Sequence, residues 1–222
     1  KRTAIANVDI GGGTSNIAVY EKGVLRGTCC LDIGGRLIKV ENGRISYIFP
    51  KIQALAAANG IPLAVGDRAY PEQLYGVCRL MAAQLAQALR LAGADRHHAG
   101  LYTNNGKPLP EQPAIRAVTY SGGVADCIYQ EMEGDVFRFG DIGVLLGKAI
   151  RADPDLSRVE RFTSIETIRA TVVGAGTHTT EVSGSTIHYE QGTLPLKNVP
   201  ILKVSEEDEA SLETLKASIL NQ

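Results

Sequence analysis

Long apolar runs and an excess of charge of either sign are both missing from this sequence. No apolar segment approaches the roughly 18 residues that a membrane-spanning helix needs, so we expect no membrane association. The 23 lysines and arginines nearly balance the 24 aspartates and glutamates, which leaves a net charge of −1 over 222 residues. Nucleic-acid-binding domains carry a clear basic excess, so we expect no nucleic-acid partner.

Cysteine is also scarce, and its spacing argues against a metal site. The four cysteines are Cys29, Cys30, Cys78 and Cys127. Zinc sites use C-x-x-C pairs or closely spaced cysteine and histidine, and this sequence contains neither. The sequence therefore predicts buried free thiols in the reducing environment of a cytoplasmic protein.

The apolar residues that are present, 44% of the chain, form short runs that predict strands near the start. Residues 3–10, 15–20 and 24–31 are apolar runs separated by turns, a spacing typical of an antiparallel three-strand meander. Asn42-Gly43 lies between β-prone residues within segment 37–49. This dipeptide favours a two-residue hairpin turn, so we expect a hairpin inserted there.

Helices and strands alternate after the meander. Between residues 71 and 92 apolar residues recur at helical spacing, with Gly93 expected to follow the helix. Residues 97–113 hold three prolines and predict a loop, in which His97 and His98 are expected to be solvated. The remaining predicted elements are a strand at 114–120, a helix at 124–132, a strand at 136–139 and a helix at 142–150. This order predicts an α/β fold with a mixed sheet.

A phosphate-binding lysine is absent from the most conspicuous glycine-rich segment, VDIGGGTSNIAVYEKG at residues 8–23. The segment has no G-K-[ST] sequence, which excludes a Walker loop. A dinucleotide fingerprint would need glycine where Asn16 stands and a helix where a strand is predicted. What remains is a glycine-rich turn between two strands, with an acid, Asp9, at its entry.

Such a turn can bind phosphate without lysine. Glycines at residues 11–13 let backbone N–H groups approach a polyphosphate closely, and Thr14 and Ser15 add hydroxyl donors. Asp9 would repel a phosphate directly, so its useful role is to hold Mg²⁺ or a metal-bound water. The alternative is a plain hairpin turn that happens to be rich in glycine.

Three further glycine pairs extend this hypothesis. Gly34-Gly35 ends a shorter echo of the loop, LDIGG, and lets the chain bend either beside a bound ligand or for structural reasons alone. Ser121-Gly122-Gly123 lies where a strand ends and a helix begins, at the sheet edge where α/β proteins bind ligands. This segment is either a binding site for a base or ribose or a tight structural turn. Gly174 and Gly176 flank Ala175 and suit the close crossing of two backbones.

Three of these segments, residues 9–14, 121–123 and 174–176, come in a specific order. In that order they resemble the second phosphate motif, the adenosine motif and the second connecting motif of the actin, sugar-kinase and heat-shock-chaperone ATPase superfamily. More narrowly, the chain is similar to the ethanolamine ammonia-lyase reactivating factor family. The stretches that carry this resemblance span most of the chain: DIGGGTSNIAVYEKG, CLDIGGRLIKV, VTYSGGVADC, DIGVLLGKAI, IRATVVGAGTHTTEVSGSTI and LPLKNVPI.

The resemblance implies an actin-like ATPase lobe, of the ribonuclease H-like kind, in a molecular chaperone. With ATP and Mg²⁺, this chaperone would free a damaged cobalamin from ethanolamine ammonia-lyase, its partner enzyme, so that intact adenosylcobalamin can bind. Asp9 would organise the metal and serve as the catalytic residue. The residues that would hold nucleotide are Gly11, Gly12, Gly13, Thr14, Ser15, Asn16, Gly34, Gly35, Ser121, Gly122, Gly123, Gly174 and Gly176.

The resemblance also sets expectations for domains and location. It implies an ATPase lobe at residues 1–183 and the start of a following domain at 184–222. Members of the superfamily bind nucleotide between two lobes, so we expect this chain to be part of a longer protein and to hydrolyse ATP negligibly alone. The location implied is the bacterial cytoplasm, with association with a metabolic microcompartment left open. An ATP-binding scaffold without turnover and a small-molecule kinase remain as alternatives.

Overall fold

The computed structural model describes residues 4–103, 106–163, 211–213 and 216. The chain divides into two compact units, Lys1–Thr179 and Thr180–Gln222. All the helices and strands described below belong to the first unit. The expected domain boundary between residues 183 and 184 stays a prediction, because the residues around it lie outside the described part of the chain.

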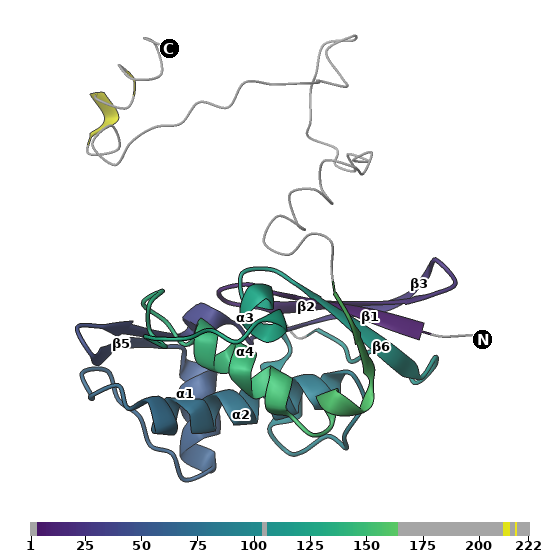
Figure 1. Ribbon diagram of the computed structural model, residues 1–222, viewed down its shortest axis with the longest axis horizontal. Helices are drawn as coiled ribbons and strands as arrows, with labels where there is room; N and C mark the ends of the chain where they lie inside the picture. Colours follow the sequence, from purple (N-terminus) through teal and green to yellow (C-terminus); the bar gives the residue numbers. More distant parts are fainter. Residues whose placement is uncertain (1–3, 104–105, 164–210, 214–215, 217–222) are drawn as a thin grey trace. The chain divides into compact units, whose positions relative to one another are not determined.

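The main sheet contains five strands in the order β3-β2-β1-β6-β7 (Figure 1). β1 (Ala4–Ile10) pairs antiparallel with β2 (Ser15–Glu21), which pairs antiparallel with β3 (Val24–Leu31). β6 (Ile115–Ser121) runs parallel to β1, and the short β7 (Glu160–Phe162) runs parallel to β6. The structure confirms both the three-strand meander and the mixed sheet of an α/β fold.

The two faces of β1 differ in burial. Ala4, Ala6, Val8 and Ile10 are at most 1% exposed, whereas the alternating residues, which include Asn7 and Asp9, are partly exposed. Successive side chains of a strand point to opposite faces. Helices α1 (Pro50–Ala58), α2 (Pro71–Ala88) and α4 (Gly143–Ala152) lie on one side of the sheet (Figure 1). The buried residues of β1 belong to the hydrophobic core.

A separate hairpin follows the meander. After the short helix η1 (Gly35–Leu37), β4 (Ile38–Glu41) pairs antiparallel with β5 (Arg44–Ile48). Asn42 and Gly43 form the turn with φ values of 50° and 71°. Positive φ at both central residues is what a two-residue hairpin turn of type I′ requires.

Helix α1 (Pro50–Ala58) follows β5 directly and was not predicted from the sequence. Proline at its first position is the usual start of a helix. Ile52, Leu55 and Ala56 are buried at helical spacing. The segment is short and its alanine-rich sequence gives only a weak amphipathic pattern, so packing against the core decides its conformation.

Helix α2 (Pro71–Ala88) ends four residues earlier than predicted. Arg90 adopts a left-handed conformation with φ 59°, and the Leu91 amide donates to the Ala86 carbonyl oxygen at 2.9 Å. This bond is the long one of a Schellman motif. The helix therefore ends at an arginine in the left-handed position rather than at Gly93.

Two further elements differ from prediction. α3 (Ala125–Tyr129) is shorter than the helix expected at 124–132, and residues 136–139 form a turn instead of a strand. The Asp135 side chain accepts a hydrogen bond from the Phe137 amide, and the Gly140 amide donates to the Phe137 carbonyl. These local bonds favour a turn over extended pairing. α4 (Gly143–Ala152) begins one residue later than predicted, and η4 (Leu156–Arg158) leads to β7.

The loop at 97–113 contains a buried histidine, contrary to prediction. His98 is 6% exposed and begins the short helix η2 (His98–Leu101). Its ring nitrogens lie 3.0 Å from the Gln84 side-chain oxygen and 3.0 Å from the Tyr102 hydroxyl. Burial lowers the pKa of His98, and Asp95 acts in the opposite direction. The ring thus ties the loop to helix α2.

The four cysteines are free thiols, as predicted, and all but Cys30 are buried. Burial raises the pKa of Cys29 to about 12 and acts more strongly than its neighbours Cys30 and Arg90. Burial also raises the pKa of Cys78. Thiols held in the protonated form are poor nucleophiles, so these side chains serve packing.

Candidate functional site

The sequence Asp-Ile-Gly occurs three times, and the structure brings the three copies together through their backbones. They begin at Asp9, Asp32 and Asp141. In the middle segment the Gly35 amide donates to the Gly11 carbonyl oxygen at 3.0 Å, and the Arg36 amide donates to the Gly12 carbonyl oxygen at 2.7 Å. In the third, the Ile142 amide donates to the Gly35 carbonyl oxygen at 3.1 Å. The middle segment therefore links the first loop to the start of α4.

The glycines of the middle segment are needed because backbones touch there. A Cβ atom on Gly34 would lie 2.4 Å from the Gly12 carbonyl oxygen, closer than van der Waals radii allow. A Cβ atom on Gly35 would lie 3.2 Å from the Gly143 Cα. Gly34 itself is extended, with φ −170°. Close crossing of two loops thus explains this glycine pair without a ligand.

The first glycine loop behaves differently. The Gly11 amide donates to the Thr14 carbonyl oxygen at 2.9 Å and closes the turn. A Cβ atom on Gly13 would meet no described atom within 4 Å, and the three atoms nearest to one on Gly12 all belong to the flexible Arg36 side chain. None of the three glycines has a positive φ. The described fold therefore does not require glycine at position 13, whereas close approach of a ligand would.

A cavity of about 380 Å³ opens at the carboxyl ends of β1 and β6, beside this loop. We call it the glycine cavity. Of the predicted site residues it is lined by Gly11, Gly12, Gly35 and Gly123. The other lining residues are Arg36, Val124, Asp126, Cys127, Met132, Phe139, Asp141 and Gly143. The structure thus joins the first loop, its echo and the predicted adenosine turn around one space.

The two residues of the Gly122-Gly123 pair have different roles. Gly122 has φ 87°, and a Cβ atom there would lie 2.5 Å from the Ile10 carbonyl oxygen. Glycine at 122 is therefore required by the fold. A Cβ atom on Gly123 would meet no described atom within 4 Å, and Gly123 lines the glycine cavity.

Arg36 and Asp141 bring charge to the glycine cavity, and sequence reasoning missed both. The Arg36 Nε lies 3.8 Å from an Asp141 carboxylate oxygen, and the other oxygen accepts a 2.8 Å hydrogen bond from the Gly143 amide. Burial raises the pKa of the Asp141 carboxyl, while the Gly143 amide and Arg36 act in the opposite direction. The third Asp-Ile-Gly copy was the sequence pattern from which Asp141 could have been found.

Asp9 lies on the other face of β1 from the buried residues that adjoin the core. The Ser121 hydroxyl donates to its carboxylate at 2.8 Å, and the Asn7 side-chain amide donates to the Ser121 oxygen at 3.2 Å. Asp9, Asn7 and Asn16 line a second, open cavity of about 490 Å³, together with Lys107. We call it the aspartate cavity. The predicted metal ligand and the glycine loop therefore adjoin in sequence but open to different cavities.

The hydroxyl of Ser15 is turned into the protein. Ser15 is fully buried, and its hydroxyl donates to the Ile33 carbonyl oxygen at 2.7 Å. This bond clamps the echo segment onto the first hairpin, so in this conformation the hydroxyl proton is engaged. Thr14, by contrast, is partly exposed. Gly174 and Gly176, the last two predicted residues, lie outside the described part of the chain.

Within the described residues, no group of three or more histidine, cysteine, aspartate or glutamate side chains is arranged to hold a metal ion. The same part of the chain contains no helix that is both long and apolar enough to cross a membrane.

Among curated proteins, the chain is 35% identical over 217 residues to "Ethanolamine ammonia-lyase reactivase EutA" of Escherichia coli (strain K12), covering 92% of this chain and 43% of that protein. It is 37% identical over 204 residues to the protein of the same name from Salmonella typhimurium (strain LT2), covering 89% of this chain and 42% of the relative. The chain thus spans less than half the length of the curated relatives it matches.

Among solved structures, the chain resembles two others more distantly. One is a non-polymerisable quadruple mutant of pCBH ParM, with a TM-score of 0.36 and 13% identity over 78% of this chain and 46% of that one. The other is component A of (R)-2-hydroxyglutaryl-CoA dehydratase from Acidaminococcus fermentans, with a TM-score of 0.32 and 14% identity over 77% and 57%.

The model of one protein family, described as ethanolamine utilisation protein EutA, matches residues 1–222. The match covers the whole sequence, so it includes segments outside the glycine-rich motifs. This chain belongs to the EutA family of ethanolamine utilisation proteins.

Proposed function

We propose that the chain carries the nucleotide-binding lobe of an ATP-dependent chaperone that reactivates ethanolamine ammonia-lyase. Two curated relatives bear the name of a reactivase of that enzyme. The observation that carries the nucleotide site is the glycine cavity, where segments around residues 11, 35, 123 and 143 meet. Ligands of α/β proteins bind at the carboxyl ends of the strands, which is where this cavity lies.

In this proposal the nucleotide spans the glycine cavity. Backbone N–H groups of the first loop hold the phosphates, with Gly13 at the exposed tip and Thr14 beside it. The adenosine lies flat against Gly123, where no side chain stands in its way. Met132 and Phe139 offer apolar contact to the base, and Phe139 is 58% exposed. An aromatic ring on an open cavity wall suits stacking with a planar base.

The residues also fit a magnesium ion bound together with nucleotide. Mg²⁺ in nucleotide sites takes one or two carboxylates and fills its other positions with phosphate oxygens and water. A single carboxylate, that of Asp9, therefore suffices on the protein side. The Ser121 hydroxyl holds this carboxylate in place. For such an ion to neutralise charge on the phosphates, the phosphates must extend past the glycine loop toward the aspartate cavity, where Lys107 brings a further positive charge.

The reactivation itself would use a change between nucleotide states. Closing a second lobe over the phosphates excludes water and strengthens every electrostatic contact to them. The link from the first loop through Gly35 to α4 offers a path from the phosphates to a helix. In the whole protein, such a movement would loosen the damaged cobalamin in the ammonia-lyase so that an intact adenosylcobalamin can enter.

The experiment uses the full-length protein and ethanolamine ammonia-lyase blocked by cyanocobalamin. With ATP and Mg²⁺, we expect cobalamin to leave the enzyme, measured by absorbance after gel filtration, and activity to return when adenosylcobalamin is added. Without ATP, or with the Gly123→Val variant, release should fall to the background rate. ATP binding without release or turnover would favour a scaffold, and ATP-dependent phosphorylation of a small molecule would favour a kinase. Either result would overturn the proposed chaperone function.

A further inference from the structure

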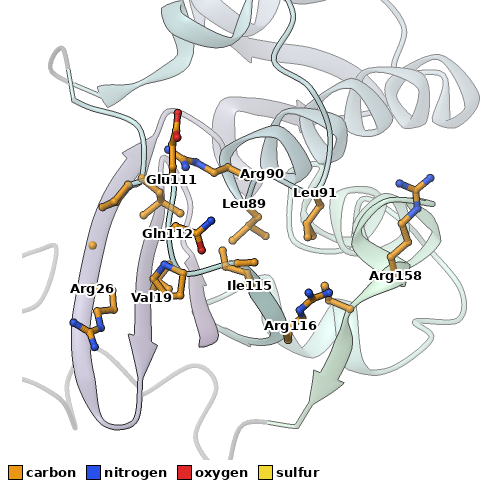
Figure 2. A pocket seen from close by; sticks show the side chains of 16 residues that line it. Val19, Arg26, Leu89, Arg90, Leu91, Glu111, Gln112, Ile115, Arg116 and Arg158 are labelled. Atoms are coloured by element: carbon orange, nitrogen blue, oxygen red, sulfur yellow. The ribbon is translucent and has the colours of Figure 1, made fainter. Parts of the chain in front are cut away.

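A third cavity, of about 330 Å³, lies at the amino end of β6 (Figure 2). We call it the arginine cavity. Ile115, the first residue of β6, lines it, whereas Gly123 and Val124, just beyond the last residue of that strand, line the glycine cavity. Seven strand residues at ~3.3 Å each separate the two ends by roughly 20 Å. The arginine cavity is therefore distinct from the proposed nucleotide site.

The floor of the arginine cavity is apolar. Its side chains come from three elements far apart in sequence: Val19 of β2, Leu89 and Leu91 at the end of α2, and Ile115 of β6. Figure 2 shows the two leucines and Ile115 lying between Arg90 on one side and Arg116 on the other. A floor of this kind suits the aliphatic or aromatic body of a ligand.

The wall opposite α2 is the segment 109–114, and it is held firmly against the sheet. A Cβ atom on Gly27 would lie 2.4 Å from the Pro110 Cδ. Glycine in β3 thus allows this proline to pack directly on the strand. Leu109 is 2% exposed and belongs to the hydrophobic core. The wall is anchored by packing, so the hollow it closes is built into the fold.

The rim carries an excess of positive charge on a chain that is close to neutral. Four arginines line the cavity, Arg26, Arg90, Arg116 and Arg158, against one acid, Glu111. Two of the arginines are already paired: Arg26 with Glu21 at 3.0 Å and Arg158 with Asp155 at 2.9 Å. Within the described residues, Arg90 and Arg116 form no ion pair.

Arg90 is placed on the rim by the end of α2. The left-handed backbone at this residue, φ 59°, closes the helix through the Leu91 and Ala86 hydrogen bond. Glycine or asparagine is the residue that normally takes such a position. An arginine there carries a backbone strain that helix capping alone does not explain, whereas a charge at the edge of a cavity does.

We propose that the arginine cavity binds a small organic anion that has an apolar body and a carboxylate or phosphate group. Guanidinium groups form paired, charge-assisted hydrogen bonds with both of these groups. The apolar floor takes the body of the ligand, Arg90 and Arg116 take its charge, and the Gln112 side chain supplies a neutral polar contact. The volume lies within the range of small-molecule sites.

The test uses phenyl phosphate and phenylacetate as probes, with benzyl alcohol as the neutral counterpart. Methyl NMR spectra of the 222-residue chain report where each probe binds. We expect the methyl signals of Leu89, Leu91 and Ile115 to shift in a saturable way with at least one of the anions. The methyl signals of Val124 and Ile142, which mark the glycine cavity and its surroundings, should not shift. Benzyl alcohol should bind at least tenfold more weakly than the anion.

Two variants test the arginines. Arg90→Asn keeps a residue that tolerates the left-handed backbone, and Arg116→Gln changes an exposed residue of β6. Each should raise the Kd about tenfold, the loss expected for one charge-assisted hydrogen bond. Arg79→Gln, an exposed arginine on α2 outside the cavity, is the matched control and should leave the Kd unchanged. Parent affinity in both test variants, equal binding of benzyl alcohol, or no shift at the floor with either anion would overturn the proposal.

Discussion

The Gly35 backbone amide donates a 3.0 Å hydrogen bond to the carbonyl oxygen of Gly11. This bond joins two segments that have nearly the same sequence, and the Gly35 carbonyl in turn accepts from Ile142 at the start of α4. The proposed phosphate loop is therefore held in place by the similar segment around Gly35. Two consecutive hydrogen bonds connect the loop to the start of α4, so a displacement of the loop would also move α4.

The close crossing of these loops leads to a prediction about stability. Gly34→Ala should lower the free energy of unfolding by about 1–3 kcal/mol or more, because the new methyl group would overlap the Gly12 carbonyl. Gly13→Ala is the control, since its methyl group meets no described atom within 4 Å. It should stay within ~0.5 kcal/mol of the parent. Urea unfolding measures both, and equal losses would contradict the close crossing.

The open face of Gly123 leads to a prediction about affinity. Gly123→Val should weaken ATP binding by at least ~1–3 kcal/mol, because a branched side chain would occupy the surface proposed for the adenosine. The fold should persist, since a Cβ atom at that position would meet no described atom within 4 Å. Calorimetric titration with ATP, supported by circular dichroism, measures both effects. Unchanged affinity for ATP would show that the turn at Gly123 does not contact the nucleotide.

The carboxylate of Asp9 leads to a prediction about turnover. In the full-length protein, Asp9→Asn should abolish Mg²⁺-dependent ATP hydrolysis, because the uncharged amide is a much poorer ligand for a hard cation. The fold should persist, since an amide oxygen can still accept the Ser121 hydroxyl hydrogen bond. Phosphate release at several Mg²⁺ concentrations is the measurement. A turnover rate equal to that of the parent would contradict the proposed role of Asp9 as a metal ligand.

A fourth prediction concerns the 222-residue chain alone. We expect it to bind ATP weakly and to hydrolyse it negligibly, because phosphoryl transfer is accelerated by charge and positioning around the whole transferring group. In the proposed site, the loop and the turn would contact a nucleotide from one side. An ATPase assay on this chain beside a version extended upstream to a second lobe provides the comparison. Comparable turnover in the two proteins would show that one lobe is a complete site.

The buried His98 leads to a prediction about pH. Because burial lowers its pKa in the folded state, the unfolded chain binds more protons as the pH falls through the ordinary histidine pKa of about 6.5. The stability present above that pH should therefore be lost progressively below it, down to the pKa of the folded state. Urea unfolding between pH 7.5 and 5 should show this slope. His98→Gln should reduce this slope.

The sequence predicted correctly those elements that depend on a pattern of only a few neighbouring residues. The alternation of β1, the turns of the meander and the Asn42-Gly43 hairpin each follow from a period of two or from turn chemistry. The start of α2 follows from Pro71 and helical spacing. Where packing competes with local pattern, prediction was wrong: α1 was missed, 136–139 was given as a strand and His98 was expected in solvent.

By itself the sequence determined the α/β class, the family and which segments are rich in glycine. It could not say what each glycine is for, because that depends on atoms far away along the chain. Only the tertiary structure decided that Gly34 and Gly122 make room for neighbouring backbone, while Gly13 and Gly123 face open space. It also decided that Asp9 and the glycine loop open to different cavities, because β1 ends at Ile10 and the turn closed by the Gly11–Thr14 hydrogen bond redirects the chain.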